Sequence, residues 1–95
     1  MKNNFILSAK LSFYIADSGS LKDKRQVRRS LIEKTRHKFN VAIAEIDTMD
    51  FHKQLTIGIA VVSGDGKHRE NSLDEIIRFM EKNTAAELTA VEIFE

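Results

Sequence analysis

The sequence predicts a protein of the α+β class, and two observations carry this prediction. Residues 5–15 and 54–63 show the two-residue alternation of apolar side chains typical of a half-buried strand, residues 41–46 and 88–94 can supply two further strands, and two segments show apolar residues at helical spacing. They follow one another in the order strand, helix, strand, strand, helix, strand. This order, βαββαβ, matches the ferredoxin-like split βαβ arrangement, in which two helices cover one face of a four-stranded antiparallel sheet.

The first strand is predicted over residues 5–15, where apolar side chains occupy every second position. Turn-forming residues follow it. Ser20 and, three positions later, Asp23 resemble a helix N-terminal capping box, with Asp in place of the usual Glu or Gln. A helix is therefore predicted to begin near Leu21.

The first helix is predicted over residues 21–39, because apolar residues gather on one side when the segment is placed at about 100° per residue. Lys24 and Arg28 also fall on this apolar side. Their alkyl stems are expected to cover apolar surface while the charged ends reach water. A helix that contacts a partner is the alternative.

Two strands are predicted over residues 41–46 and 54–63, both of which are rich in β-branched residues. They should form a hairpin. Gly64 and Gly66 then break the strand pattern.

The second helix is predicted from the helical spacing of apolar residues between Leu73 and Met80. Ser72 and Glu75 match a capping box at its start. An earlier start, near Lys67, is the alternative.

A last strand is predicted over residues 88–94, and it completes a sheet with one face turned away from the helices. The residues placed on this open face form a mixed and fairly apolar set: Lys10, Ser12, Tyr14, Ala42, Ala44, Ile46, Thr56, Ala60, Val91 and Ile93. An apolar face of this kind is often an interaction surface, so the sequence is compatible with a homodimer.

Composition limits the classes of function. The 95 residues suit one domain, residues 1–95, since a second domain would lack the residues to bury a core. The chain has no cysteine, which excludes disulfides and thiolate chemistry and fits a reducing compartment. Neither a secretory leader nor a membrane span is recognisable. A cytoplasmic protein without a membrane role is expected.

The main charge feature is the first predicted helix. Eight of the fifteen Lys and Arg residues lie between residues 22 and 38. Four of them stand at i, i+3, i+7 and i+14, a narrow sector of the helix that we call the basic ridge: Lys22, Arg25, Arg29 and Arg36. Such a row can contact successive phosphates of RNA, and a merely solvated helix face is the alternative. Lys24 is added to the ridge as a predicted RNA-binding residue.

The aromatic residues indicate which kind of RNA is favoured. Single-stranded RNA is typically held by bases that stack on Phe or Tyr of a sheet. The predicted strand at residues 54–63 has no aromatic residue, and Tyr14 is the one candidate on the open face. Structured RNA contacted through its backbone therefore fits better, and Tyr14 is predicted to contact a partner.

The hairpin connection, residues 47–53, contains groups that could bind a metal ion. Asp47, Asp50 and His52, together with Glu45, offer oxygen and nitrogen ligands. Loops also use Asp for turn chemistry, which is the more ordinary reading. No metal site is predicted.

The same connection holds two large apolar residues, Met49 and Phe51, which are expected to anchor the hairpin or to contact a partner. The sequence shows no recognisable catalytic constellation, no Gly-x-Ser-x-Gly motif and no phosphate-binding loop. No catalytic residue and no cofactor is predicted, and the chain is expected not to be an enzyme.

The sequence also resembles a known family, in the segments Ser20-Leu21-Lys22-Asp23-Lys24-Arg25-Gln26-Val27, Phe39-Asn40-Val41, Ala44-Glu45-Ile46-Asp47 and Gly58-Ile59-Ala60-Val61-Val62-Ser63. Over nearly its whole length it resembles the YlxP-like family of small bacterial proteins of uncharacterised function. The resemblance implies a ferredoxin-like fold. Family members are often encoded among translation-initiation and ribosome-maturation factors, which implies an association with ribosomes or RNA.

The resemblance implies a shared role for the positions that match: Ser20, Leu21, Lys22, Lys24, Arg25, Asp47 and Asp50. The chain departs from the family at three places. Arg28 and Thr35 stand where aliphatic residues are usual, and Phe51-His52 stands where a Leu-Trp-like pair is common. The first helix is therefore less apolar than in the family, and a shared hairpin contact is altered.

Residues and resemblance together predict a non-enzymatic binding protein. Its basic first helix is expected to contact ribosomal or other structured RNA by neutralising phosphate charge. A homo-oligomeric protein-interaction module with a solvated basic ridge and no nucleic-acid role is the alternative.

Overall fold

Six elements make up the fold, and their order confirms the predicted βαββαβ arrangement. The computed structural model describes residues 5–64 and 66–94. For residues 66–71 it describes the backbone only. The elements are β1 (Ile6–Tyr14), α1 (Leu21–Lys38), β2 (Ala42–Glu45), β3 (Gln54–Val62), α2 (Gly66–Lys82) and β4 (Glu87–Phe94). The predicted turn at residues 64–66 falls partly outside the description, which omits residue 65.

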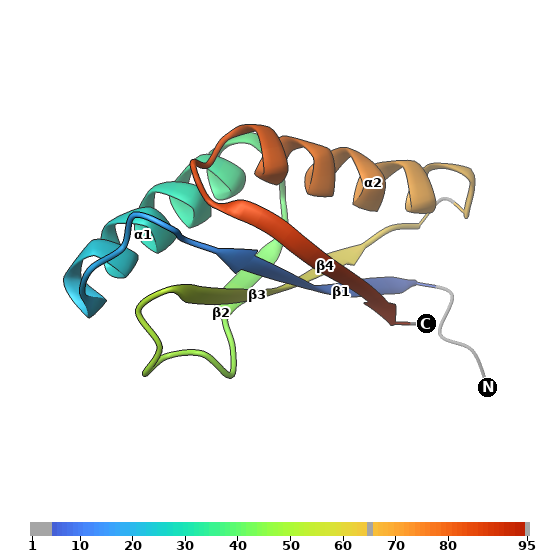
Figure 1. Cartoon of the computed structure of the whole chain (residues 1–95). Helices are drawn as coiled ribbons and strands as arrows, with labels where there is room; N and C mark the ends of the chain where they lie inside the picture. Colours follow the sequence, from blue (N-terminus) through green and yellow to red (C-terminus); the bar gives the residue numbers. More distant parts are fainter. Residues whose placement is uncertain (1–4, 65, 95) are drawn as a thin grey trace.

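The four strands form one antiparallel sheet in the order β2-β3-β1-β4. β1 pairs with β3 along its whole length, from Ile6 opposite Val62 to Tyr14 opposite Gln54. β2 pairs with β3, which confirms the predicted hairpin. Figure 1 shows both helices on one side of the sheet, and this confirms the ferredoxin-like prediction.

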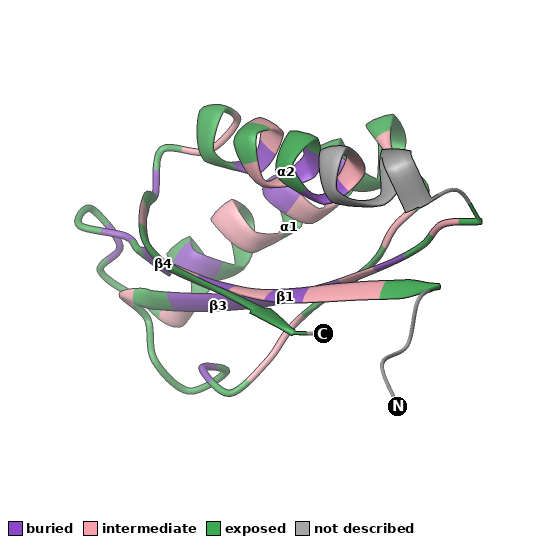
Figure 2. Ribbon diagram, turned by 90° about the vertical axis from the view of Figure 1, so that its right-hand side faces the viewer, coloured by how far each residue is buried: buried purple, intermediate pink, exposed green. Residues whose placement is uncertain are grey.

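The core lies between the sheet and the two helices, where Figure 2 shows the buried segments of both layers facing each other. Its most deeply buried apolar side chains are Leu11, Leu31, Leu55, Ile57 and Met80, each 0% exposed. The alternation along β1 and β3 produces this core, because every second side chain of each strand points toward the helices. Full burial of such a side chain contributes about 1.5–3 kcal/mol relative to leaving it in water.

The start of α1 is fixed by the predicted cap. The backbone N–H of Asp23 donates to Ser20 Oγ at 3.1 Å, and Asp23 Oδ2 accepts from the N–H of Gly19 at 2.9 Å. The carboxylate thus reaches one residue further back than in the usual capping box.

The start of α2 differs from the capping-box prediction. The helix begins at Gly66, so Ser72 lies inside it and does not cap it. The alternative start near Lys67 is correct to within one residue. Among the described residues, neither helix combines the length and apolar content that crossing a membrane requires.

The register of β4 corrects the prediction for the open face. A register shift between Ser12 and Phe13 leaves Val91 opposite Leu11 and Ile93 opposite Ala9. Opposed residues share one face of a sheet, and Leu11 and Ala9 belong to the core. Val91 and Ile93 therefore lie on the helix-facing side, at the edge strand, and not on the open face.

Candidate nucleic-acid interface

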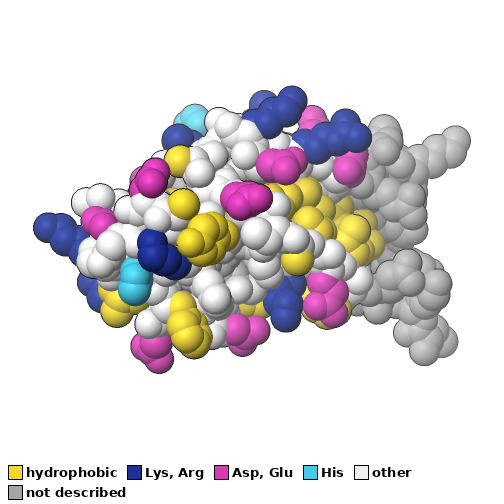
Figure 3. Space-filling view, in the orientation of Figure 1, with side chains coloured by type: hydrophobic (Ala, Val, Ile, Leu, Met, Phe, Trp, Pro, Cys, Tyr) yellow, Lys and Arg dark blue, Asp and Glu magenta, His cyan; other side chains and the backbone are white. Residues whose placement is uncertain are grey.

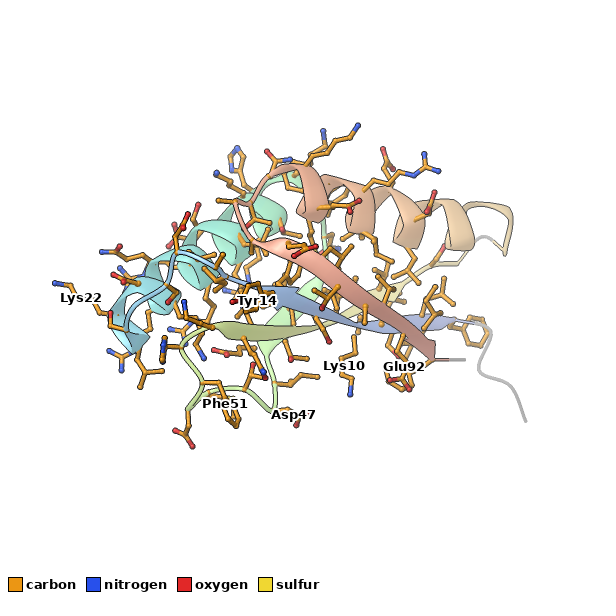
Figure 4. The ribbon with its side chains drawn as sticks, viewed as in Figure 1. Lys10, Tyr14, Lys22, Asp47, Phe51 and Glu92 are labelled. Atoms are coloured by element: carbon orange, nitrogen blue, oxygen red, sulfur yellow. The ribbon has the colours of Figure 1, made fainter. Side chains whose placement is uncertain are left out.

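The outer face of α1 carries three cations of the basic ridge in water. Lys22, Arg25 and Arg29 are all exposed. Within the part of the chain that the structure describes, none of the three pairs with an acidic side chain. Figure 4 shows Lys22 projecting from the end of the molecule at which α1 begins. Their positive charge is therefore available to a partner.

The fourth member of the ridge, Arg36, is exposed but also makes an internal contact. Its Nη2 donates to the carbonyl oxygen of Ile43 at 3.1 Å. One part of this guanidinium thus joins α1 to β2, and its remaining donors face water.

Lys24 requires a correction, because the structure buries it. Its side chain is 1% exposed, and its ammonium donates to Glu45 Oε2 at 2.8 Å, to the carbonyl oxygen of Thr48 and to that of Met49 at 3.3 Å. An ammonium has three donors, and these three acceptors satisfy them. Lys24 therefore has no donor left for a phosphate. The prediction that its charged end reaches water is wrong, because the side chain is buried.

Glu45 receives a second cation from the same helix. Arg28 Nη1 lies 3.1 Å from Glu45 Oε1, and the Thr48 hydroxyl donates to Glu45 Oε2 at 3.0 Å. Burial alone raises the pKa of the Glu45 carboxyl, but hydrogen bonds from Lys24, Arg28 and Thr48, with the charge of Lys24, hold that pKa below its ordinary value. This contact explains why Arg28 stands on the apolar side of the helix.

We call the four residues Lys24, Arg28, Glu45 and Thr48 the hairpin lock, because they join α1 to the connection between β2 and β3. Sequence reasoning missed Glu45 and Thr48 as partners of the two cations. A signal for Glu45 was present, since it stands two residues after buried Ile43 and therefore points to the same side of β2.

The loop of residues 47–53 has a defined backbone. Asp47 has φ of 65°, a left-handed conformation in which Asp is enriched among non-glycine residues. The N–H of Phe51 donates to the Thr48 carbonyl oxygen at 3.0 Å, which closes a four-residue turn. Thr48 Oγ1 also accepts the N–H of Thr56 at 2.8 Å. The loop is thus bonded both within itself and to β3.

The loop acids and histidine are not assembled with Glu45 into a metal site. Both Glu45 oxygens already accept hydrogen bonds from the lock. In residues 5–64 and 66–94, no three His, Asp or Glu side chains are gathered as metal ligands. Asp47, Asp50 and His52 are exposed.

The three predicted partner-contact residues are exposed but lie in two places. Met49 and Phe51 are 57% and 56% exposed in the loop, which reaches the same end of the molecule as Lys22 (Figure 4). Tyr14 is 42% exposed at the end of β1, opposite Gln54 and on the open face. Met49 and Phe51 therefore belong to the loop that Lys24 joins to the start of α1, whereas Tyr14 belongs to the sheet itself.

Comparison with known proteins finds similarity to a family, to a bacterial protein and to a solved structure. The profile of the family described as "Protein of unknown function (DUF503)" matches residues 6–93. The "Uncharacterized protein YlxP" of Bacillus subtilis (strain 168) is 36% identical over 75 residues, which are 79% of this chain and 82% of that protein. Among solved structures, the "De novo designed protein Ferredog-Diesel" aligns with a TM-score of 0.44 and 10% identity, covering 97% of this chain and 88% of that chain.

Proposed function

This chain belongs to the DUF503 family of proteins of unknown function, and from its own residues we propose that it is a non-enzymatic protein that binds structured RNA, ribosomal RNA included. The binding surface is the exposed part of the basic ridge. One observation carries the proposal: the five cations in the first half of the helix fall into two groups. Lys24 and Arg28 both pair with the Glu45 carboxylate, whereas Lys22, Arg25 and Arg29 are exposed and face water.

The spacing of the three exposed cations suits a phosphate backbone. Lys22 and Arg29 are seven residues apart, which is about 10 Å along a helix. A duplex strand carries one phosphate per about 3.4 Å of axis, so the row spans several phosphates. Contacts of this kind are tolerant of sequence and sensitive to salt.

The test measures binding of a fluorescent RNA hairpin and of ribosomal subunits as a function of salt. The variant Lys22→Ala/Arg25→Ala/Arg29→Ala is compared with the control Lys34→Ala/Arg78→Ala/Lys82→Ala, which removes the same charge from exposed positions elsewhere on the helices. Arg36 is left in place, because its contact with Ile43 would be lost as well.

The wild-type protein is expected to bind at low salt. The plot of log affinity against log salt should become shallower by about 2–3 units in the ridge variant, since each phosphate contact contributes about 0.7–0.9. The control should keep most of the wild-type slope. No binding at low salt, or equal slopes in the ridge variant and the wild type, contradicts the proposal.

A second candidate function is self-association through the open face of the sheet. Four large apolar residues on that face are 42–76% exposed: Ile6, Tyr14, Val62 and Phe94. Phe94 also lines a shallow hollow of about 560 Å³, whose lining includes the small residues Ala42, Ala44, Gly58 and Ala60. A second copy that covered this face would remove apolar surface from water.

Light scattering over a range of concentrations tests this candidate. Val62→Lys places a charge on the open face, and Ser30→Lys adds the same charge on exposed α1. A homodimer should persist in the Ser30 variant and dissociate in the Val62 variant. A monomer at every concentration of the wild-type protein excludes the candidate.

A further inference from the structure

The loop of residues 47–53 exposes two apolar side chains, and hydrogen bonds hold its backbone in place. The Lys24 ammonium binds two carbonyl oxygens of the loop, those of Thr48 and Met49. The Thr48 carbonyl also accepts the N–H of Phe51. A loop that is already ordered loses less conformational freedom on binding than a mobile one. The loop is therefore already held in one conformation before any partner binds.

The exposed groups of the loop determine which partner it suits. Single exposed apolar residues are common on protein surfaces and need no explanation. Here Met49 and Phe51 are both more than half exposed, two positions apart, on a turn that the buried Lys24 supports. The side chain of Phe51 ends in an aromatic ring, which offers a flat apolar surface.

The charges on the helix and on the loop favour different groups of a partner. Lys22, Arg25 and Arg29 lie on the neighbouring helix. The loop itself holds the exposed acids Asp47 and Asp50, and the ammonium of its Lys53 donates to the carbonyl oxygen of Ala16 at 2.7 Å. Figures 3 and 4, drawn in one orientation, show apolar side chains among charged ones at the end where Lys22 and Phe51 are labelled. The two loop carboxylates repel phosphate, so phosphates are favoured on the helix and disfavoured on the loop.

An RNA can contact the cationic helix and the apolar side chains of the loop at the same time. Its phosphates neutralise the helix, and its bases are uncharged and flat. A base is available for stacking where it is unpaired, as in a bulge or a loop of a folded RNA, and base–aromatic stacking is a common mode of recognition there. A fully paired duplex offers no such base to Phe51.

We propose that the loop of residues 47–53 is a base-contacting element, in which Phe51 stacks on an unpaired base of a structured RNA whose phosphates lie along α1. The inference rests on the proposed function and adds the class of RNA: a stem with an unpaired nucleotide beside it. Lys24 is a positioning residue in this arrangement, because it holds the loop and does not touch the RNA.

Two RNA hairpins with the same stem, one with a single bulged nucleotide and one fully paired, test the inference. The bulged nucleotide is 2-aminopurine, whose fluorescence reports stacking. Four proteins are compared: wild type, Phe51→Ala, Phe51→Leu and Phe51→Tyr. Phe51 is 56% exposed, so these replacements should leave the fold intact, which a thermal unfolding curve checks.

Wild type and Phe51→Tyr should bind the bulged hairpin more tightly than the paired one and change the 2-aminopurine signal. Phe51→Ala should weaken binding to the bulged hairpin by about 5-fold to 150-fold, the range for loss of one stacked base. Phe51→Leu should also lose the 2-aminopurine signal, because it keeps an apolar side chain without the ring. The salt slope should not change, because no phosphate contact is lost.

The outcomes separate this inference from the proposed function. If the ridge variant loses affinity while Phe51→Ala binds both hairpins as the wild type does, the base-contacting loop is wrong and the phosphate-binding helix stands. If the wild type binds neither hairpin at low salt, both are wrong. If Phe51→Ala instead dissociates a homodimer without changing RNA affinity, the loop contacts a second copy and the inference is overturned.

Discussion

The ammonium of Lys24 and the carboxylate of Glu45 lie 2.8 Å apart, with their side chains only 1% and 4% exposed. The two residues are 21 positions apart in the sequence. Their contact joins the first helix to the hairpin on the opposite side of the core. Removing one of two buried charges of opposite sign is costly, because the other then loses a partner in a low-dielectric environment.

Replacing Lys24 by Met should therefore lower the free energy of unfolding by about 1–3 kcal/mol, since Glu45 keeps Arg28 and Thr48 but loses its most deeply buried partner. The double variant Lys24→Met/Glu45→Leu should be close to the wild type in stability, because it removes both charges and keeps apolar volume. Urea unfolding of the two variants and the wild type measures the difference. A double variant as unstable as the single one would show that Glu45 is not what makes Lys24 necessary.

The same double variant tests whether Lys24 contacts RNA or only supports the hairpin loop from inside the protein. Because the Lys24 ammonium is bonded to three internal acceptors, its removal should leave the number of phosphate contacts unchanged. The salt dependence of RNA binding should then have the wild-type slope. A slope shallower by about one unit would return Lys24 to the binding surface.

The lowered pKa of Glu45 makes stability dependent on pH. Burial acts to raise this pKa, and the hydrogen bonds and charges of the hairpin lock outweigh burial, so the carboxyl releases its proton more readily in the folded chain than in the unfolded chain. Its contribution is complete above its ordinary pKa of 4.5 and is lost as the pH falls through the lower folded value. Between pH 7 and pH 3, the wild type should lose more unfolding free energy than Lys24→Met/Glu45→Leu. If urea titrations show that both proteins lose the same unfolding free energy over this pH range, Glu45 is not the source of the pH dependence.

The strands and the first helix were predictable because their signals are local. Alternation along β1 and β3 identifies the core face from neighbouring residues alone, and Ser20 marks the helix start through a contact three residues away. The Ser72–Glu75 pattern places the start of α2 too late, because it occurs inside the helix. The apolar spacing that identified the helix begins only at Leu73, well after Gly66.

Two other features depend on contacts between distant segments. The register shift between β1 and β4 turns Val91 and Ile93 to the helix side, and the three-residue spacing from Leu88 to Val91 is its local sign in the sequence. The burial of Lys24 depends on Glu45 and Thr48, which approach it only when the hairpin packs against α1. In the ridge, exposure follows from helical spacing, so Lys22, Arg25 and Arg29 were placed correctly in water.

Replacing Ser20 by Ala should lower the stability of the protein by about 1 kcal/mol, because the N–H of Asp23 loses the hydroxyl that caps α1. Ser20→Asp is the matched control, since Asp also accepts at this position and should cost much less. Thermal unfolding distinguishes the two. Equal losses would indicate that the Ser20 hydroxyl does not stabilise the helix start.

Thr48 offers the most specific test of the hairpin lock, because one hydroxyl serves two elements. It donates to Glu45 Oε2 at 3.0 Å and accepts the N–H of Thr56 in β3 at 2.8 Å. Thr48→Val keeps the shape and removes both bonds, which leaves a buried N–H without its acceptor, at a cost of about 1–3 kcal/mol. Thr48→Ser keeps the hydroxyl and should retain most of the stability. Hydrogen exchange of the Thr56 amide should accelerate relative to other β3 amides in Thr48→Val and not in Thr48→Ser. Unchanged relative exchange in Thr48→Val would mean that this hydroxyl does not hold the loop to β3.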